Sequence, residues 1–250
     1  MIERRVFKDS TGRIVYPVDT IFPILSGDPE TQEFEFVATG FFIHAGGGFV
    51  TAKHVMLDND GKPTKPFFAV QTIEGKEHVI RRIGHWSQSN ISDICVGLLV
   101  PQQYTREMGW QPREIRAVPL TLNLSQLSIN DEIKTFAYPL SKISNRDGEQ
   151  WGEFEGKWIN GVIEDHFPKG RDTVLLPGPC YQTSMTILGG ASGGPVIKDG
   201  GVVGINSTGY DGTQLSYITP ITEVLELNVL YKKGTISIKE LIEMKHIPVM

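Results

Sequence analysis

A serine set among glycines is the first feature of this sequence that could do chemistry. Ser192 lies in GGASGG, residues 189–194, which fits the pattern G-x-S-x-G found around nucleophilic serines. Small neighbours allow a sharp backbone turn, and they let a substrate carbonyl come close to main-chain N–H groups. The segment therefore predicts a nucleophile, although a serine in a glycine-rich segment, taken alone, is more often a turn residue.

The order of the partner residues decides between two designs. An α/β-hydrolase runs Ser, acid, His, but only His246 follows Ser192, and the repeated βα units of that fold are missing. The order His, Asp, Ser is available, because His54 ends TAKH and Asp93 opens the apolar segment SDICVGLLV. A carboxylate at Asp93 would accept the Nδ1–H of His54 and stabilise the imidazolium that forms when Ser192 loses its proton.

Composition indicates a folded protein and argues against several classes of partner. The chain has 250 residues, of which 40% are hydrophobic and 21% charged, and its net charge is −5. We do not expect nucleic acid as a main partner, since the sequence has no run of Lys and Arg and no basic–aromatic stripe. We expect no membrane association either, because no apolar run approaches the ~18 residues of a membrane span and the start lacks the apolar core of a secretory signal.

The two cysteines, Cys95 and Cys180, are too few for a disulfide framework. We therefore expect free thiols and a cytoplasmic location, where thiols stay reduced. No motif implies a metal ion or an organic cofactor.

Short runs rich in Val, Ile, Phe and Thr, separated by Gly, Pro, Asn and Asp, predict an all-β sandwich or barrel. Glycines at 46–48 and the DGG at 199–201 are typical of hairpin turns. The expected strands fall at 20–25, 35–45, 48–52, 66–73, 78–83, 94–100, 132–138, 196–206 and 216–221.

Two other kinds of segment interrupt this pattern. The polar stretch 101–116 lies between the β-rich halves and predicts a crossover. Helical patterns are clear only at 222–231 and 237–246, and the second starts with Ser237 as a plausible N-cap and Glu240 three residues on.

Four blocks of the sequence together resemble the trypsin-like serine proteases of the chymotrypsin fold, and are nearest in style to bacterial high-temperature-requirement proteases. The resemblance spans roughly residues 20–221, and it implies two six-stranded antiparallel barrels with the active site in the cleft between them. The blocks are TGFFI…GGFVTAKHV (39–55), SDICVGLLV (92–100), GGASGGPVI (189–197) and GVVGINS…LSYITPI (201–221).

On this reading the chain is a serine endopeptidase with four parts. They are an N-terminal barrel (1–105) carrying His and Asp, a crossover linker (106–118), a C-terminal barrel (119–221) carrying Ser, and a C-terminal helical segment (222–250).

The resemblance also implies a role for each residue of the site. His54 would act as general base and then acid, Asp93 would orient it, and Ser192 would attack the peptide carbonyl to form an acyl-enzyme. The N–H groups of Gly190 and Ser192 would form the oxyanion hole. We expect Ser192 within about 2.6–3.2 Å of the imidazole, or somewhat looser without substrate.

Further positions of the family pattern imply substrate contacts. Ser207, Thr208 and Gly209 would pair with the substrate backbone, Thr186 would lie at the base of the primary specificity pocket, and Ser216 would line its wall. None of these residues is charged, so a Lys or Arg side chain entering the pocket would lose hydration without a paired carboxylate. We expect small or medium uncharged side chains at the cleaved residue, and acidic ones as the second choice.

Two departures from the family pattern bear on regulation. Ala191 stands where secreted relatives carry the Asp that pairs with a newly cleaved N-terminus, so activation of that kind is not expected. Only about 29 residues follow the last matching block, fewer than the ~50 of a small domain, so an attached PDZ-like module is not expected.

The main hypothesis is a protease that is always active on protein or peptide substrates. Two alternatives to it stay open. One is a catalytically silent peptide-binding or scaffold protein that keeps the cleft. The other is a protease that stays inactive until a regulatory protein partner reshapes the loop at 189–192.

Overall fold

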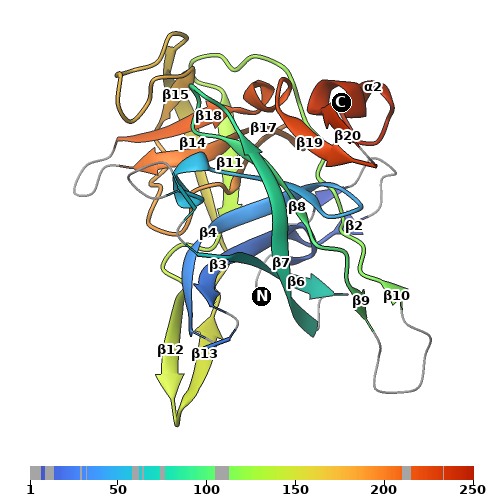
Figure 1. The fold of residues 1–250 in the computed structure, drawn as a ribbon. Coiled ribbons are helices and arrows are strands. Elements are labelled where there is room, and N and C mark those ends of the chain that lie inside the picture. The colour runs from blue at the N-terminus through green and yellow to red at the C-terminus, as the bar shows by residue number, and fades with distance from the viewer. Residues whose placement is uncertain are drawn as a thin grey trace.

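The structure, a computed structural model, describes residues 7–8, 14–28, 30–31, 33–57, 62–63, 65–73, 77–104, 113–209, 215–232 and 234–250. Its strands form two closed six-stranded antiparallel barrels (Figure 1), which confirms the fold expected from the sequence.

The first barrel packs around a cluster of phenylalanines. The rings of Phe22 and Phe42 lie 4.5 Å apart between centroids, and Phe49 meets Phe22 edge-on at 5.7 Å. The turn between the second and third strands contains Gly47 at φ +92°, which confirms the hairpin expected there. In barrel order the strands are β3 (Ile21–Asp28), β4 (Glu33–His44), β5 (Gly48–Thr51), β8 (Cys95–Leu99), β7 (Glu77–Gln88) and β6 (Phe67–Ile73).

The second barrel contains the other expected hairpin. Asp199 and Gly200 both have positive φ, 53° and 87°, as a two-residue turn of type I′ requires. Its interior is filled by aliphatic side chains such as Ile133, Val196 and Ile218. In barrel order the strands are β11 (Glu132–Ala137), β14 (Lys157–Phe167), β15 (Cys180–Thr183), β18 (Ser216–Pro220), β17 (Gly201–Gly209) and β16 (Pro195–Lys198).

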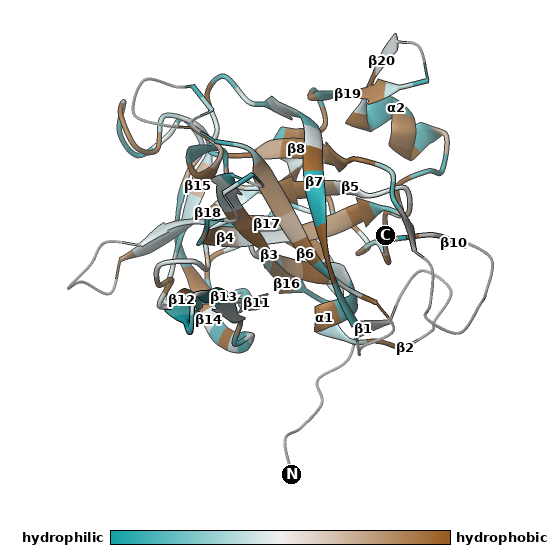
Figure 2. Ribbon diagram, turned by 60° about the horizontal axis from the view of Figure 1, so that its bottom comes forward, coloured by the Kyte–Doolittle hydropathy of each residue, from teal (hydrophilic) through white to brown (hydrophobic). Residues whose placement is uncertain are grey.

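A third apolar cluster joins the barrels to each other. It contains Phe41 and Val50 from the first barrel and Phe136 and Ile205 from the second. Figure 2 shows the hydrophobic residues concentrated on the barrel strands. Because each fully buried side chain of this kind contributes roughly 1.5–3 kcal/mol, the two barrels are held in a defined relative position.

A hairpin of β12 (Lys142–Arg146) and β13 (Glu149–Glu153) projects away from the second barrel (Figure 1). Its Gln150 side chain accepts from the N–H of Phe34 at 2.8 Å and donates to the carbonyl of Phe34 at 3.2 Å. The hairpin is thereby fastened to β4 of the first barrel.

The C-terminal segment corrects one prediction. Residues 222–231 do not form the expected helix, since a short 3₁₀ helix, η2 (Ile221–Val224), is followed by strand β19 (Asn228–Tyr231) paired with β20 (Gly234–Ser237). In β19, Val229 and Tyr231 are half-buried whereas Asn228 and Leu230 are exposed. This alternation has the period of a strand, which prevails over the helical pattern.

The second expected helix is present and shorter than predicted. It is α2 (Ile238–Glu243), and Ser237 forms a complete capping box with Glu240. Neither this helix nor any other described helix is long and apolar enough to cross a bilayer.

The predicted crossover is described only in part. Strands β9 (Gln103–Tyr104) and β10 (Arg113–Glu114) pair with each other, and the residues between them lie outside the described part. The remaining short elements are β1 (Phe7–Lys8), β2 (Ile14–Val15), α1 (Pro17–Thr20) and the 3₁₀ helix η1 (Lys53–Val55).

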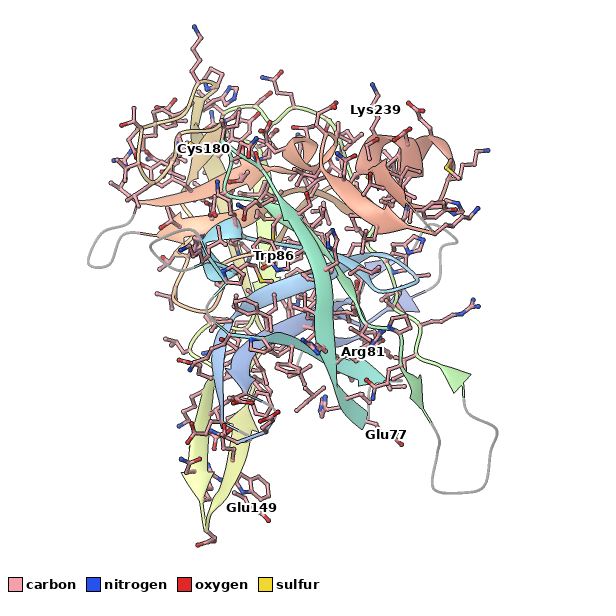
Figure 3. All side chains as sticks on the ribbon, in the orientation of Figure 1. Glu77, Arg81, Trp86, Glu149, Cys180 and Lys239 are labelled. Carbon is pink, nitrogen blue, oxygen red and sulfur yellow. The ribbon has the colours of Figure 1, made fainter. Side chains whose placement is uncertain are left out.

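Both cysteines are free thiols, as expected. Cys95 is buried at the start of β8 in the first barrel. Cys180 is buried at the start of β15 in the second barrel and is labelled in Figure 3. Burial raises the pKa of the Cys180 thiol to about 11, so it stays protonated at neutral pH.

Candidate active site

His54 and Asp93 meet because the strands next to them pair. Thr51, the last residue of β5, lies opposite Cys95, the first residue of β8. The chain continues from Thr51 into η1, which carries His54, and Asp93 comes two residues before β8. The Asp93 carboxylate accepts from the backbone N–H of His54 at 2.9 Å and lies 2.8 Å from its Nδ1. The contact expected from the sequence is present.

The two side chains of this pair differ in their exposure to solvent. The Asp93 side chain is 9% exposed and the His54 side chain 47% exposed. Burial opposes charge on both groups, but their hydrogen bond and opposite charges prevail. The pKa of His54 is therefore raised above its usual 6.5, and the pKa of the Asp93 carboxyl is lowered.

The loop that presents Asp93 is anchored at several points. The Ser89 hydroxyl accepts from the N–H of Ser92 at 3.0 Å, and Lys53 donates to the Ser89 carbonyl at 3.1 Å. The Ser92 hydroxyl donates to the carboxylate of Glu223, in η2, at 2.5 Å. Asp93 is thus held from its own barrel and from the segment that follows the other barrel.

Residues 189–194, here called the nucleophile loop, turn where the barrels touch. Gly190 and Gly193 have φ of +85° and +80°, which side chains rarely tolerate. A Cβ on Gly193 would collide with the Thr51 hydroxyl and the Thr39 carbonyl of the first barrel. The N–H of Thr39 donates to the Ser192 carbonyl at 3.0 Å, so the loop is bonded directly to β4.

The amides of Gly190 and Ser192 donate no hydrogen bond within the described part of the chain. The carbonyls nearby have other partners, since Leu140 donates its N–H to Gly189 at 3.2 Å and Thr39 donates its hydroxyl to Gly190 at 2.8 Å. The two amides expected to form an oxyanion hole are therefore available to an external acceptor.

Ser207 connects the serine to the Asp–His pair. The Ser192 hydroxyl donates to the Ser207 carbonyl at 3.3 Å, and the buried Ser207 hydroxyl donates to the Asp93 carboxylate. Among the described residues Ser192 makes no hydrogen bond to His54, so the expected approach of its hydroxyl to the imidazole stays a prediction. The sequence predicted Ser207 only as a substrate-binding residue, and its contact with Asp93 was missed.

The expected specificity residues are only partly brought together. Ser216 is buried, pairs with Gly209 across β17 and β18, and accepts from the N–H of Ile187 at 3.1 Å. Thr208 lies opposite Tyr217 in the same pair of strands. Ile187, which the sequence analysis did not single out, is thus the residue beside Ser216 and Gly209.

Thr186 lies differently from the expectation. Its neighbours Met185 and Ile187 are buried in the second barrel, so the side chain of Thr186 between them is exposed to solvent. A residue at the base of a narrow pocket would be shielded, so contact between Thr186 and substrate stays a prediction. Among the described residues, no three His, Cys, Asp or Glu side chains gather in a way that could hold a metal ion.

Comparisons with known proteins agree with this geometry. The family model described as a trypsin-like peptidase domain matches residues 38–205, a range that contains His54, Asp93 and Ser192. A search of curated protein sequences gives no match.

Several solved structures share the fold. Deg5 is 19% identical over 88% of this chain and 92% of its own, with a TM-score of 0.58. The active form of the Rv3671c protease from M. tuberculosis is 17% identical over 82% of this chain and 78% of its own, with a TM-score of 0.52. The HtrA-type protease AlgW, solved with a decapeptide, is 15% identical over 84% of this chain and 63% of its own, with a TM-score of 0.54.

Proposed function

The chain belongs to the trypsin-like peptidase family and is a serine endopeptidase, and from this premise we propose that His54, Asp93 and Ser192 are its catalytic triad. The observation that carries the proposal is the 2.8 Å contact between His54 Nδ1 and Asp93 Oδ2. Ser207 supports it, because the same residue bonds Asp93 with its hydroxyl and Ser192 with its carbonyl. The three side chains thereby belong to one hydrogen-bonded unit that spans both barrels.

In the first half of the proposed reaction His54 is the base. Asp93 accepts the Nδ1–H, which leaves the lone pair on Nε2 to take a proton. The Ser192 hydroxyl turns from the Ser207 carbonyl to Nε2, and its oxygen attacks the peptide carbonyl carbon as the proton passes to His54. The resulting oxyanion accepts from the N–H groups of Gly190 and Ser192.

The second half returns the enzyme to its starting state. The C–N bond breaks, the leaving amine takes the proton from His54, and the acyl group stays on Ser192 as an ester. Water then attacks the ester and gives a proton to His54. When the ester bond breaks, that proton returns to the Ser192 oxygen and the carboxylic acid product leaves.

We also propose a protein or peptide substrate that lies extended along β17, where Ser207, Thr208 and Gly209 provide backbone groups. A regulatory partner could act on the nucleophile loop through the Leu140–Gly189 hydrogen bond, which joins this loop to the residues preceding β12. The two free, buried cysteines support a cytoplasmic location.

The pH dependence of cleavage tests the role of His54. The base must be neutral, and Asp93 raises the pKa of His54 above 6.5. We expect kcat/KM to be low at acidic pH and to rise through an apparent pKa above 6.5, because deprotonation creates the active form. Initial rates on a peptide substrate from about pH 5 to about pH 9 measure this. A profile that falls over this range would exclude His54 as the base.

Cleavage preference tests the specificity residues. Ser216 and Gly209 offer a hydroxyl and backbone groups beside Ile187, and none of these residues carries a charge. We expect cleavage mainly after small or medium uncharged residues, such as Ala, Val, Leu or Thr, and secondarily after acidic ones, since a buried cation would lack a counterion. Mass spectrometry of a digested, denatured proteome measures the preference. Predominant cleavage after Lys or Arg would overturn the assignment.

A further inference from the structure

A cavity of ≈170 Å³ lies between the first barrel and the C-terminal segment. One wall comes from β4, β5 and β8, and the other from β19, α2 and the residues after α2. The lining is mostly apolar, and the side chains that define it include Ile43, Phe49, Val96, Leu98, Leu241 and Ile247. This space shares no lining residue with the proposed active site.

The polar residues that line the cavity can donate hydrogen bonds or carry positive charge. His44, Tyr231 and Lys232 are among its lining residues, and none of the described lining residues is acidic. The His246 ring lies 6.1 Å from the His44 ring, and its Nε2 is 3.3 Å from the Tyr231 hydroxyl. The Lys232 ammonium lies 5.1 Å from the centre of the Tyr231 ring. Hydrogen-bond donors and a cation therefore gather beside an apolar space.

One titration supports this description. His44 accepts from the N–H of Gly46 through Nδ1 at 3.0 Å, so its neutral form carries the proton on Nε2. Burial and then the nearby His246 lower the pKa of His44. Burial thus keeps His44 neutral with a hydrogen on Nε2 that can donate to a carboxylate, and Lys232 is the lining residue that supplies positive charge.

We propose that this cavity binds a small carboxylate with a linear apolar tail, such as a medium-chain fatty acid. The tail would fill the apolar space and the carboxylate would meet Lys232 and His44. A cavity of about 150 Å³ lined by Leu, Ile and Phe side chains accommodates benzene, so a tail of roughly six to eight carbons fits this one. The cavity is distinct from the substrate cleft and adds a ligand to the protein.

Two strands connect the cavity to the proposed triad. Gly48 and Phe49 of β5 and Val96, Gly97 and Leu98 of β8 line it. These two strands pair with each other along their length, and their far ends lead to the proposed general base and its orienting carboxylate. A bound tail would hold this strand pair and the C-terminal segment together.

Titration of the full chain with octanoate, octylamine and octanol tests the proposal. We expect octanoate to bind saturably by calorimetry and to raise the melting temperature, octanol to bind at least tenfold more weakly, and octylamine not to bind. These readouts do not depend on proteolysis, so they stand even where the proposed triad fails. Equal binding of octanoate and octylamine, or no saturable octanoate binding, would overturn the proposal.

Three variants locate the site. Lys232→Glu should weaken octanoate binding at least tenfold, whereas Lys239→Glu, the same charge change on α2 at a position pointing into solvent (Figure 3), should leave it unchanged. Leu241→Trp should fill the cavity and abolish binding. Leu98→Trp should fill the cavity from the barrel side and also abolish octanoate binding. The test therefore holds even if only one of these two variants folds. Unchanged octanoate binding in Lys232→Glu or in a folded filling variant would contradict the assignment.

Discussion

Replacing Ser192 with Ala is expected to lower kcat by about 10⁶-fold and to abolish labelling by a fluorophosphonate probe. The methyl group has no oxygen to attack a carbonyl or to form the covalent adduct, and the residues around it keep their positions because Ser192 is bonded to Thr39 through its backbone. Peptide hydrolysis measures the first effect, and mass spectrometry of the labelled protein should place the adduct on Ser192.

Ser128→Ala is the matched control, since it removes an exposed hydroxyl from the same half of the chain. It should label and cleave as the unmodified protein does. An adduct that persists in Ser192→Ala would show that another residue is the nucleophile. Absence of labelling in the folded, unmodified protein, with and without candidate partners, would favour the silent peptide-binding protein instead.

The change Asp93→Asn is expected to lower kcat by about 10⁴-fold. The carboxylate now accepts from Nδ1 and from the backbone N–H of His54, and it also receives the Ser207 hydroxyl. An amide would keep the shape but hold the imidazole in the wrong tautomer and lose the charge that raises the pKa of His54. The residual activity should therefore also show an acid limb shifted to lower pH.

Asp131→Asn is the control for this change. Asp131 pairs with Lys198 at 2.7 Å in the second barrel, so the variant removes one carboxylate and one ion pair away from the site. Its kcat should be unchanged. A loss of less than tenfold in folded Asp93→Asn would show that this carboxylate only supports the loop and does not orient the base.

The strands with a strong apolar pattern were the ones that the sequence revealed. Runs such as 35–45 and 94–100 fall on β4 and β8, because β4 is buried from Ala38 to Ile43 and β8 over most of its length, and their residue types reflect this. The hairpin turns were equally visible, since positive φ restricts the residue choice at Gly47 and Gly200.

Other strands carried too little signal. In β14, only Ile163 is fully buried among eleven residues, so its mixed composition does not alternate clearly. None of the strands expected from the sequence covers residues 157–167. Every residue of β13 is exposed, and that strand depends on its partner β12 rather than on an apolar face.

In the candidate site, too, the sequence predicted some features and could not predict others. The order and flanking residues of His54, Asp93 and Ser192 predicted which side chains belong together, because the chemistry restricts residue type at each position. The two bonds of Ser207 could not be predicted, since they depend on how the barrels face each other. The exposure of Thr186 was missed for a related reason: the buried neighbours on either side decide its direction.

The division of the site between two barrels also has a consequence for biosynthesis. The ribosome makes the N-terminal half first, so the first barrel, which ends its strands at Leu99, can fold with His54 and Asp93 in place. The proposed nucleophile, Ser192, and the residue that links it to Asp93, Ser207, are added only afterwards. A nascent chain therefore carries no complete site, and a newly made molecule gains the means to cut its surroundings only when its second barrel closes against the first.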